Sequence, residues 1–405
     1  MDYIYVFIFN YMVLSVFFLI ILYNSNNGIL VLSFLIPVEG FSNQYGLYYG
    51  ISLIKVIGVF LLLNACINTF NMKSYKINTS LFLYVLLLLW AIYSMVWTSF
   101  SYNNFRNLFS LVQYVVLLLV FTTHINKIGY IINLKAFLFG TLISLIVSIV
   151  QTCSNDCYVR LAGGNGGPNH TAVILVMSIV FALIITKKEP NNRYYYFAYC
   201  IITAIAIAWT KSMSGLIGLL IIAIYVIWYG RRAIKYFYII TLSTLIYSYY
   251  DFLSFFLYQK YYGSFADRLF YWDLALSAAK DNLGGSGIGT WLLIYRNYLS
   301  SDISSLASYK YLNLESFASP ESVHNSYLEI LVELGLIGLL LYISVIILAF
   351  TKTLNFRNSK DVDSRINNLF NCSITLMVIF LAVLANSLYS KLLIFILANI
   401  IIFLK

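Results

Sequence analysis

Long apolar stretches separated by short polar connections dominate the pattern of this chain. An α-helix needs about 17 to 25 apolar residues to cross the hydrocarbon core of a bilayer. Stretches of this kind predict about twelve transmembrane helices, at residues 3–23, 47–70, 79–97, 105–123, 130–150, 171–186, 195–209, 213–229, 234–250, 325–350, 371–388 and 391–404. A further piece at 29–36 is stopped by Pro37 and is too short to span alone, which leaves a half-helix, a re-entrant segment or a second short span.

Composition supports the same class. Hydrophobic residues make up 61% of the chain and charged residues 10%, with a mean hydropathy of +0.85, far beyond what a soluble domain tolerates. The predicted fold class is therefore all-α, a polytopic membrane helical bundle. We expect three parts: 1–250 with spans one to nine, 251–323 as a large outer loop containing short helices, and 324–405 with spans ten to twelve.

Basic residues orient this bundle, because short loops rich in Lys and Arg stay in the cytoplasm. One set of alternate connections holds most of them: Lys73, Lys76, Lys127, Lys187, Lys188, Arg193, Arg231, Arg232, Lys235, Lys352, Arg357, Lys360, Arg365 and Lys405. Both termini are therefore expected in the cytoplasm and 251–323 outside. The net charge of +10 then reflects topology. It does not indicate a nucleic-acid partner, since acidic residues outnumber basic ones in the outer loop.

The short outer connections hold candidate anion contacts. The glycine-rich segment 162–167 lies between Arg160 and a span that starts near Asn169, so its amides and the helix N-terminus could cradle a phosphate. The alternative is a flexible turn in which Asn169 or Thr171 caps the helix. Lys211, in the next outer connection, is either an interfacial lysine or a contact to substrate phosphate.

The large outer loop contains an amphipathic helix pattern at 267–280, with Asp267 as its expected N-cap and a glycine-rich turn at 284–289 as its end. A surface helix over the bundle explains most of this pattern. Arg268, in its first turn, can instead face inward, with Trp272 one turn further on.

His324 closes this loop at the mouth of a span that carries two carboxylates. Asn325, Glu329 and Glu333 are four residues apart and share one helix face, which places Glu333 about 13 Å below the helix start. Carboxylates at that depth need partners or water. They either serve the chemistry or pair with a lysine such as Lys55 or Lys135 to hold helices together.

Cysteine spacing is less informative. Cys153 and Cys157 share an outer connection, where an oxidising environment would permit a disulfide, and the sequence leaves its formation open. Cys66, Cys200 and Cys372 are expected to be packing residues, and no spacing indicates a zinc site.

These pieces together resemble the bacterial O-antigen ligase and O-antigen polymerase superfamily, over roughly residues 155–345. The most specific piece is His324-Asn325-x-x-Leu328-Glu329-x-x-x-Glu333-x-Gly335-x-x-Gly338. The order of the other pieces agrees: Arg160 to Asn169 before a span, the outer turn Thr210 to Ser214, then Arg268 to Trp272 and Gly285 to Gly289. One departure is Lys211, because the family usually has arginine at or near this place, and lysine cannot form a bidentate fork to phosphate.

The resemblance implies a metal-independent membrane glycosyltransferase of the C-type fold, without a cofactor, whose donor is an undecaprenyl-pyrophosphate-linked glycan at the periplasmic face of the inner membrane. It implies that His324, Arg268 and Glu329 are catalytic, with Arg268 on the pyrophosphate and His324 on the acceptor hydroxyl. Arg160, Lys211, Asn325, Trp272, Asn169 and Glu333 are then expected to bind substrate. A chain-length regulator and a flippase are the expected protein partners.

The motifs do not separate two transferase activities. A polymerase joins repeat units on the lipid carrier, and a ligase moves the finished glycan to lipid A core. The 36 tyrosines and 30 phenylalanines favour a polymerase, because their rings could line a groove that binds sugars. Aromatic belts at the membrane interface also use tyrosine. The alternative outside this class is a small-solute or glycan transporter, against which stand the absence of internal sequence repeats and the long outer loop leading into His324.

Overall fold

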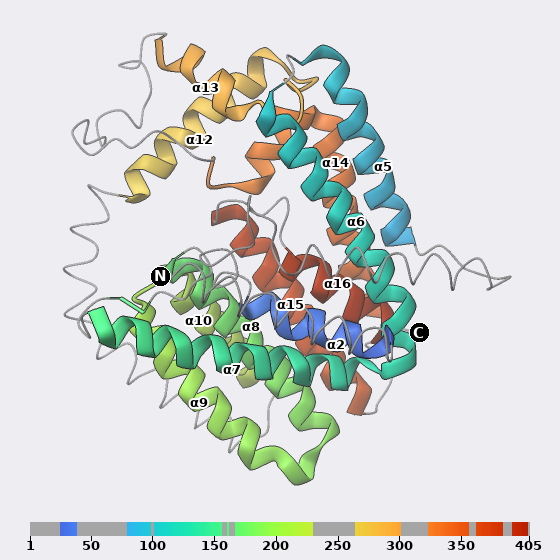
Figure 1. The fold of residues 1–405 in the computed structure, drawn as a ribbon, viewed down its shortest axis with the longest axis vertical. Coiled ribbons are helices and arrows are strands. Elements are labelled where there is room, and N and C mark those ends of the chain that lie inside the picture. The colour runs from blue at the N-terminus through green and yellow to red at the C-terminus, as the bar shows by residue number, and fades with distance from the viewer. Residues whose placement is uncertain are drawn as a thin grey trace, which may run out of the picture.

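The computed structural model describes residues 25–38, 79–98, 101–155, 160–161, 167–229, 264–300, 323–355, 362–383 and 391–403. Within these ranges the chain forms α-helices and short 3-10 helices and no strand, which confirms the all-helical class (Figure 1). The predicted spans at 3–23, 47–70 and 234–250 lie outside the described residues. The count of twelve spans and the three-part division therefore stay predictions.

Most helices coincide with the predicted apolar stretches. The first are α2 (Ser25–Leu35), η1 (Ile36–Val38), α5 (Thr79–Ser94), η3 (Met95–Trp97), α6 (Tyr102–Ile128) and α7 (Tyr130–Asn155). They are followed by α8 (Pro168–Lys188), η4 (Pro190–Asn192), α9 (Arg193–Thr210) and α10 (Met213–Tyr229). The last are α12 (Ser264–Asp281), α13 (Trp291–Ser300), α14 (Ser326–Asn355), α15 (Val362–Val383) and α16 (Lys391–Phe403).

Several helix ends differ from the prediction by a few residues, and the starts of α15 and α12 change its interpretation. Helix α15 begins at Val362 rather than near 371, because a helix continues through the polar residues that precede its apolar part. Helix α12 begins at Ser264, so Asp267 lies inside the helix and is not its N-cap. Nothing in Ser264-Phe265-Ala266 interrupts a helix, and α12 therefore extends one turn further than its amphipathic pattern indicated.

Helix α8 occupies the centre of the bundle. It packs against α7, α9, α10 and α15, and most of its side chains are buried. Helix α14 packs against α5, α12 and α15, and α16 packs against α6. The 11-residue helix α2 packs against α6 and α7. At about 16 Å it is roughly half as long as a span, in agreement with the expectation that this segment cannot cross alone.

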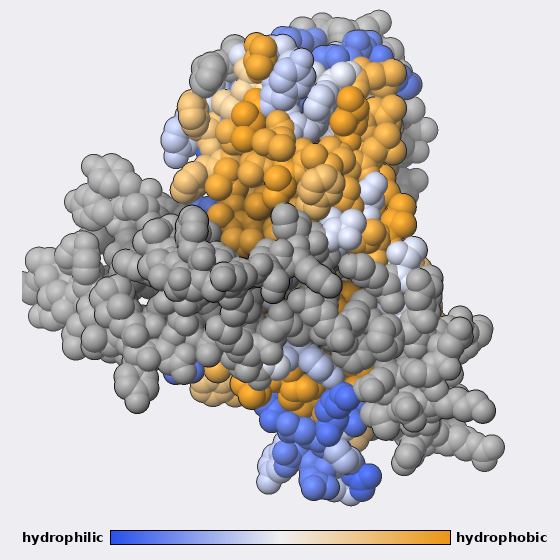
Figure 2. Space-filling model, turned by 90° about the vertical axis from the view of Figure 1, so that its right-hand side faces the viewer, coloured by the Kyte–Doolittle hydropathy of each residue, from blue (hydrophilic) through white to orange (hydrophobic). Residues whose placement is uncertain are grey.

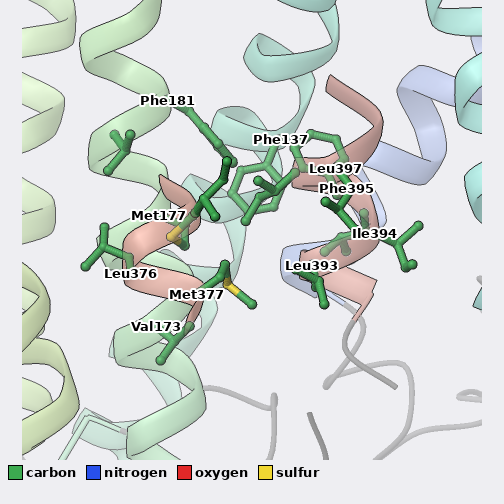
Figure 3. Close-up of a cluster of buried hydrophobic side chains, with 14 of the residues drawn as sticks. Phe137, Val173, Met177, Phe181, Leu376, Met377, Leu393, Ile394, Phe395 and Leu397 are labelled. Carbon is green, nitrogen blue, oxygen red and sulfur yellow. The ribbon is translucent and has the colours of Figure 1, made fainter. Parts of the chain in front are cut away.

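Aromatic rings hold the centre together. The rings of Phe137, Phe181 and Phe395, from α7, α8 and α16, have centroid separations of 5.0 to 5.7 Å (Figure 3). Met177 and Met377 lie beside them and are also buried. In lipid, where the hydrophobic drive between helices is absent, dispersion contacts and specific packing stabilise helix association. This cluster is the part of the main buried core where α7, α8 and α16 meet.

The outside of the bundle is apolar. Large hydrophobic side chains such as Phe82, Leu89 and Phe139 are more than half exposed. Figure 2 shows an apolar surface (orange) over the upper part of one face, with polar surface at the upper and lower ends. By length and composition, five helices among the described residues can cross a membrane: Thr79–Trp97, Tyr102–Thr122, Tyr130–Cys153, Pro168–Lys188 and Ser326–Thr351. The chain is a membrane protein.

The last of these five is not one continuous helix. Gly335 has φ 67° and ψ −168° inside α14, so that the residues before and after it form two helical segments, 326–334 and 336–355. In a straight helix Tyr327 and Tyr342 would be about 22 Å apart along the axis, yet their ring centroids are 6.1 Å apart. The prediction of one uninterrupted span at 325–350 was wrong.

Helices α12 and α13 form a second, smaller core beside the first part of α14 (Figure 1). The buried side chains of Phe270, Leu274 and Ala278 face Trp291 of α13 and Val332 of α14 in this cluster. The helix predicted from the amphipathic pattern therefore exists and packs on the bundle, with Arg268 near its start.

Candidate active site

His324 is fixed by the beginning of α14. The side-chain Oδ1 of Asn325 accepts hydrogen bonds from the backbone N–H groups of Tyr327 (3.0 Å) and Leu328 (3.2 Å). This is an N-cap, which satisfies donors that the first turn of a helix leaves free. Asn325, predicted to contact substrate, thus uses its side-chain oxygen to cap the helix that begins directly after it. His324 is the residue immediately before this cap.

The backbone of His324 is itself unusual. Among the described residues, the non-glycine residues with positive φ are Lys211 (51°) and His324 (56°). A left-handed conformation costs a non-glycine residue on the order of 1–3 kcal/mol and concentrates at functional sites. Both residues were candidates on sequence grounds.

Arg268 and His324 influence each other electrostatically. Burial lowers the pKa of Arg268. Burial also lowers the pKa of His324 to about 4, with further contributions from the charges of Arg268 and His170. The ring of Tyr271 stacks beside His324 at a centroid distance of 6.2 Å. His324 is therefore a neutral imidazole at neutral pH, able to accept a proton.

Among the described residues, no carboxylate forms an ion pair with Arg268, His170 or His324. The ion pair that the described residues contain joins Lys135 Nζ of α7 to Glu189 Oε1 after α8, at 2.6 Å. Lys135 therefore does not pair with Glu329 or Glu333, and Lys55 lies outside the described residues. A half-buried guanidinium is costly without an anion, so the surroundings of Arg268 favour an anionic ligand.

Arg160 braces the end of α9. Its Nε donates to the carbonyl oxygen of Thr210 (2.9 Å) and its Nη2 to that of Lys211 (3.1 Å). The backbone N–H of Leu161 donates to the carbonyl oxygen of Trp209 (3.2 Å). A cation at the carbonyl end of a helix is favoured by the helix dipole. Arg160 and Lys211, both predicted to contact the substrate, thus lie side by side, and Arg160 stabilises the turn that contains Lys211.

Asn169 connects the start of α8 to the start of α10. Its Oδ1 accepts a hydrogen bond from Ser212 Oγ at 2.7 Å, and the hydroxyls of Ser212 and Ser214 are 2.8 Å apart. The expectation that Asn169 or Thr171 caps α8 was wrong: the N-cap is Gly167, without a side-chain hydrogen bond, because Pro168 begins the helix. The glycines at 163, 164 and 166 lie outside the described residues.

The structure thus gathers segments that are far apart in sequence. Asn169 is bonded to the α9–α10 turn, and its neighbour His170 faces Arg268 and His324. The sequence did not single out His170 and Tyr271 as site residues. Their signals were weak: His170 directly follows Asn169, and Tyr271 lies three residues after Arg268, on the same face of α12.

Trp272 packs in the second core, half-buried, and its buried Nε1 has no hydrogen-bond partner in the described structure. Glu329 is buried one turn below Asn325, and its Oε2 likewise has no partner there. Each of these two side chains therefore has one buried hydrogen-bonding atom that the described residues leave unused.

Glu333 has a different environment from Glu329, although both lie on the face of 326–334 that the sequence predicted. Its Oε2 accepts the backbone N–H of Gly289 (2.8 Å) and its Oε1 that of Trp291 (3.3 Å). Its side chain is 1% exposed. Both carboxylate oxygens are thus bound by the protein's own backbone.

Metal ligands do not cluster in the part of the chain that the structure describes: no group of three or more His, Cys, Asp or Glu side chains is placed to hold an ion. Cys153 is exposed at the end of α7. Cys157 lies outside the described residues, so the structure does not test a disulfide between the two. Cys200 and Cys372 are buried in the bundle, as expected of packing residues.

Comparison with known protein families gives one match that bears on this site. A family model described as O-antigen ligase matches residues 198–343, which run from α9 to the middle of α14 and contain Arg268 and His324. Comparison with curated proteins gives no significant match.

Proposed function

We propose that the chain, of which residues 198–343 match a family model described as O-antigen ligase, belongs to the O-antigen ligase and polymerase superfamily and polymerises lipid-linked oligosaccharide repeat units. The donor is an undecaprenyl-pyrophosphate-linked glycan, and the reaction occurs at the periplasmic face of the inner membrane. The observation that carries the proposal is the half-buried cluster of Arg268, His170 and His324, which carries no acidic partner in the described residues and lies within or beside the matched region.

The proposed chemistry is a single displacement. The acceptor hydroxyl oxygen forms a bond to the anomeric carbon of the donor sugar, the bond from that carbon to the pyrophosphate oxygen breaks, and the hydroxyl proton passes to His324. The lipid pyrophosphate leaves with the electron pair. Arg268 stabilises the charge that develops on this leaving group, which is the kind of electrostatic contribution that accounts for much of enzymatic rate enhancement.

The surrounding residues support these two groups. Lys211, braced by Arg160, and Asn169 at the start of α8 extend the polar surface toward the pyrophosphate. Glu329 supplies a buried carboxylate oxygen, and Trp272 an indole N–H, for substrate hydroxyls. Because fixed cations meet the charge of the leaving group, the reaction requires no metal ion, and a chelator should leave activity intact.

A ligase that transfers the finished glycan to lipid A core is the second candidate, favoured by the description of the matching family. Deleting the gene and separating the surface glycans on a gel distinguishes the two. Loss of a polymerase leaves core with a single repeat unit, whereas loss of a ligase leaves bare core and polymer retained on the lipid carrier. An unchanged profile would refute both.

His324→Ala tests the assigned base directly. We expect transfer to fall on the order of 100-fold to 10,000-fold, the contribution typical of a positioned general base. The variant should remain in the membrane at the wild-type level. Full activity in this variant would exclude His324 as the base while leaving the gel result on the reaction class unaffected.

A further inference from the structure

The break in α14 is filled by the glycine turn, residues 282–290. The N–H groups of Ser286 and Gly287 donate to the carbonyl oxygens of Val332 (2.9 Å) and Glu333 (2.7 Å). In return, Leu336 donates its N–H to the carbonyl of Leu283 (3.0 Å). An interrupted helix within a membrane protein needs such replacement partners for its freed backbone groups.

Two glycines make this insertion possible. A Cβ on Gly335 would lie 2.4 Å from the carbonyl carbon of Gly284, and a Cβ on Gly285 would lie 2.4 Å from the nitrogen of Gly335. Both residues have positive φ, which favours glycine. The close approach of two backbones therefore explains the spacing of these glycines, and neither position tolerates a side chain.

Helix α5 and the short helix η3 that follows it also contact this junction. Trp90 Nε1 donates to the carbonyl oxygen of Leu334 (2.8 Å), and Trp97 Nε1 donates to that of Gly285 (3.1 Å). The junction thus joins three parts of the chain that are distant in sequence: α5 with η3, the turn after α12, and α14.

Glu333 is the side chain that binds this junction to α13. Its carboxylate accepts N–H groups from Gly289 in the turn and from Trp291 at the start of the 10-residue helix α13. A carboxylate at a helix N-terminus is favoured by both hydrogen bonding and the helix dipole. Because this carboxylate is buried and both of its oxygens are used, it anchors the loop and does not face a substrate.

The anchor acts on the candidate site through two short connections. The helix segment 326–334, which ends at the junction, begins two residues after His324, and α12, which carries Arg268, ends at Asp281 just before the glycine turn. We propose that Glu333 is a positioning residue for the transfer reaction, because it holds the glycine turn in the break of α14 and so sets Arg268 in place relative to His324. This proposal rests on the proposed function.

The first test is Glu333→Gln in the full-length protein. A glutamine keeps one acceptor oxygen but turns its amide N–H toward a backbone N–H, so one of the two bonds is lost. Since misplacement by about 1 Å can cost on the order of 100-fold, we expect kcat to fall 10- to 100-fold. The KM for the lipid-linked donor should change by less than about threefold, because no ground-state contact to substrate is removed. Unchanged kcat, or a raised KM with unchanged kcat, would overturn the proposal.

A matched pair of glycine substitutions separates the junction from general damage to the loop. Gly285→Ala places a methyl group against the backbone of Gly335 and should reproduce the loss in kcat. At Gly284 the nearest atom to an added Cβ is the side-chain Oδ1 of Asn282, at 3.3 Å, so Gly284→Ala should retain near-wild-type activity. Trp90→Phe, which removes one donor to the junction, should fall between them. Equal losses of kcat in the two alanine variants would contradict the proposed role of the junction.

A readout without substrate keeps this proposal distinct from the proposed function. The pH dependence of diethyl pyrocarbonate modification at His324, followed by mass spectrometry, reports the pKa of its imidazole. The charged groups that face His324 are Arg268 from α12 and His170 from α8. Burial, the larger cause of the lowered pKa, remains in Glu333→Gln, but the pKa of His324 should rise above about 4 because Arg268 is held less closely. No shift refutes the positioning role even if the protein is a transferase, and a shift supports it even if the transfer assay fails.

Discussion

At the residue scale, His324 is kept uncharged by its surroundings. Burial and the charge of Arg268 lower its pKa to about 4, whereas an exposed histidine has a pKa near 6.5. A base must be neutral to accept a proton, so kcat/KM should rise with pH through the pKa of the free enzyme's base. We expect the acid limb of the profile near pH 4, with activity retained at pH 5.5, where an ordinary histidine would be mostly protonated.

Arg268→Gln provides the control for this assignment. Removing the guanidinium charge should raise the pKa of His324, because less positive charge then opposes protonation. Protonation should therefore begin to suppress the modification of His324 at a higher pH than in the wild type. A wild-type acid limb near pH 6.5 would show that His324 is not shielded in this way.

The same shift links pH to stability. Between pH 6.5 and about 4, an unfolded chain binds a proton at His324 that the folded protein does not. This group therefore reduces the free energy of unfolding as the pH falls through that window, and has no such effect above it.

At the element scale, the aromatic cluster joins α7, α8 and α16. Phe137 is fully buried and stacks on Phe395 at 5.0 Å. We expect Phe137→Ala to destabilise the protein by about 3–5 kcal/mol, the range for loss of a buried ring with a residual cavity. The measurement is a melting curve in detergent.

Phe139→Ala is the matched control on the same helix. Phe139 is 60% exposed on the outside of the bundle, so its truncation should change stability by less than about 1 kcal/mol. Equal effects of the two substitutions would show that the cluster in Figure 3 does not hold the helices together.

The elements show where sequence patterns suffice. Apolar length predicted the helix at 79–97 and the one at 213–229 to the residue, because in a membrane the apolar stretch itself is what the bilayer selects. The break at Gly335 was not predicted, since the residues around it continue a helical apolar pattern. It exists because a turn 50 residues earlier supplies the replacement hydrogen bonds.

The site residues divide in the same way. Arg268 and His324 could be named as candidates from the motif, because their proposed chemistry depends on residue type. The partners of Glu333 were not, since a backbone N–H leaves no mark in the sequence. Lys135, a candidate partner for the glutamates, pairs with Glu189 instead, because α7 and α8 place their ends together.

At the scale of the whole molecule, the two ends of α8 lie in different surroundings. Its first turn carries Asn169 and His170 beside the candidate site, and its other end leads to the Lys135–Glu189 pair. The 21 residues of α8 extend about 31 Å, close to the thickness of the hydrocarbon core. We therefore predict that the site and the ion pair lie on opposite sides of the membrane. The distribution of Lys and Arg predicts that the site faces the periplasm.

Cysteine labelling tests this orientation. In a background without the five natural cysteines, Lys280→Cys and Asn191→Cys each place one thiol at an exposed position near opposite ends of the molecule. A membrane-impermeant maleimide added to spheroplasts should label Lys280→Cys at once and Asn191→Cys only after the membrane is opened. The reverse order would place Arg268 and His324 in the cytoplasm, where a lipid-linked donor presented in the periplasm could not reach them.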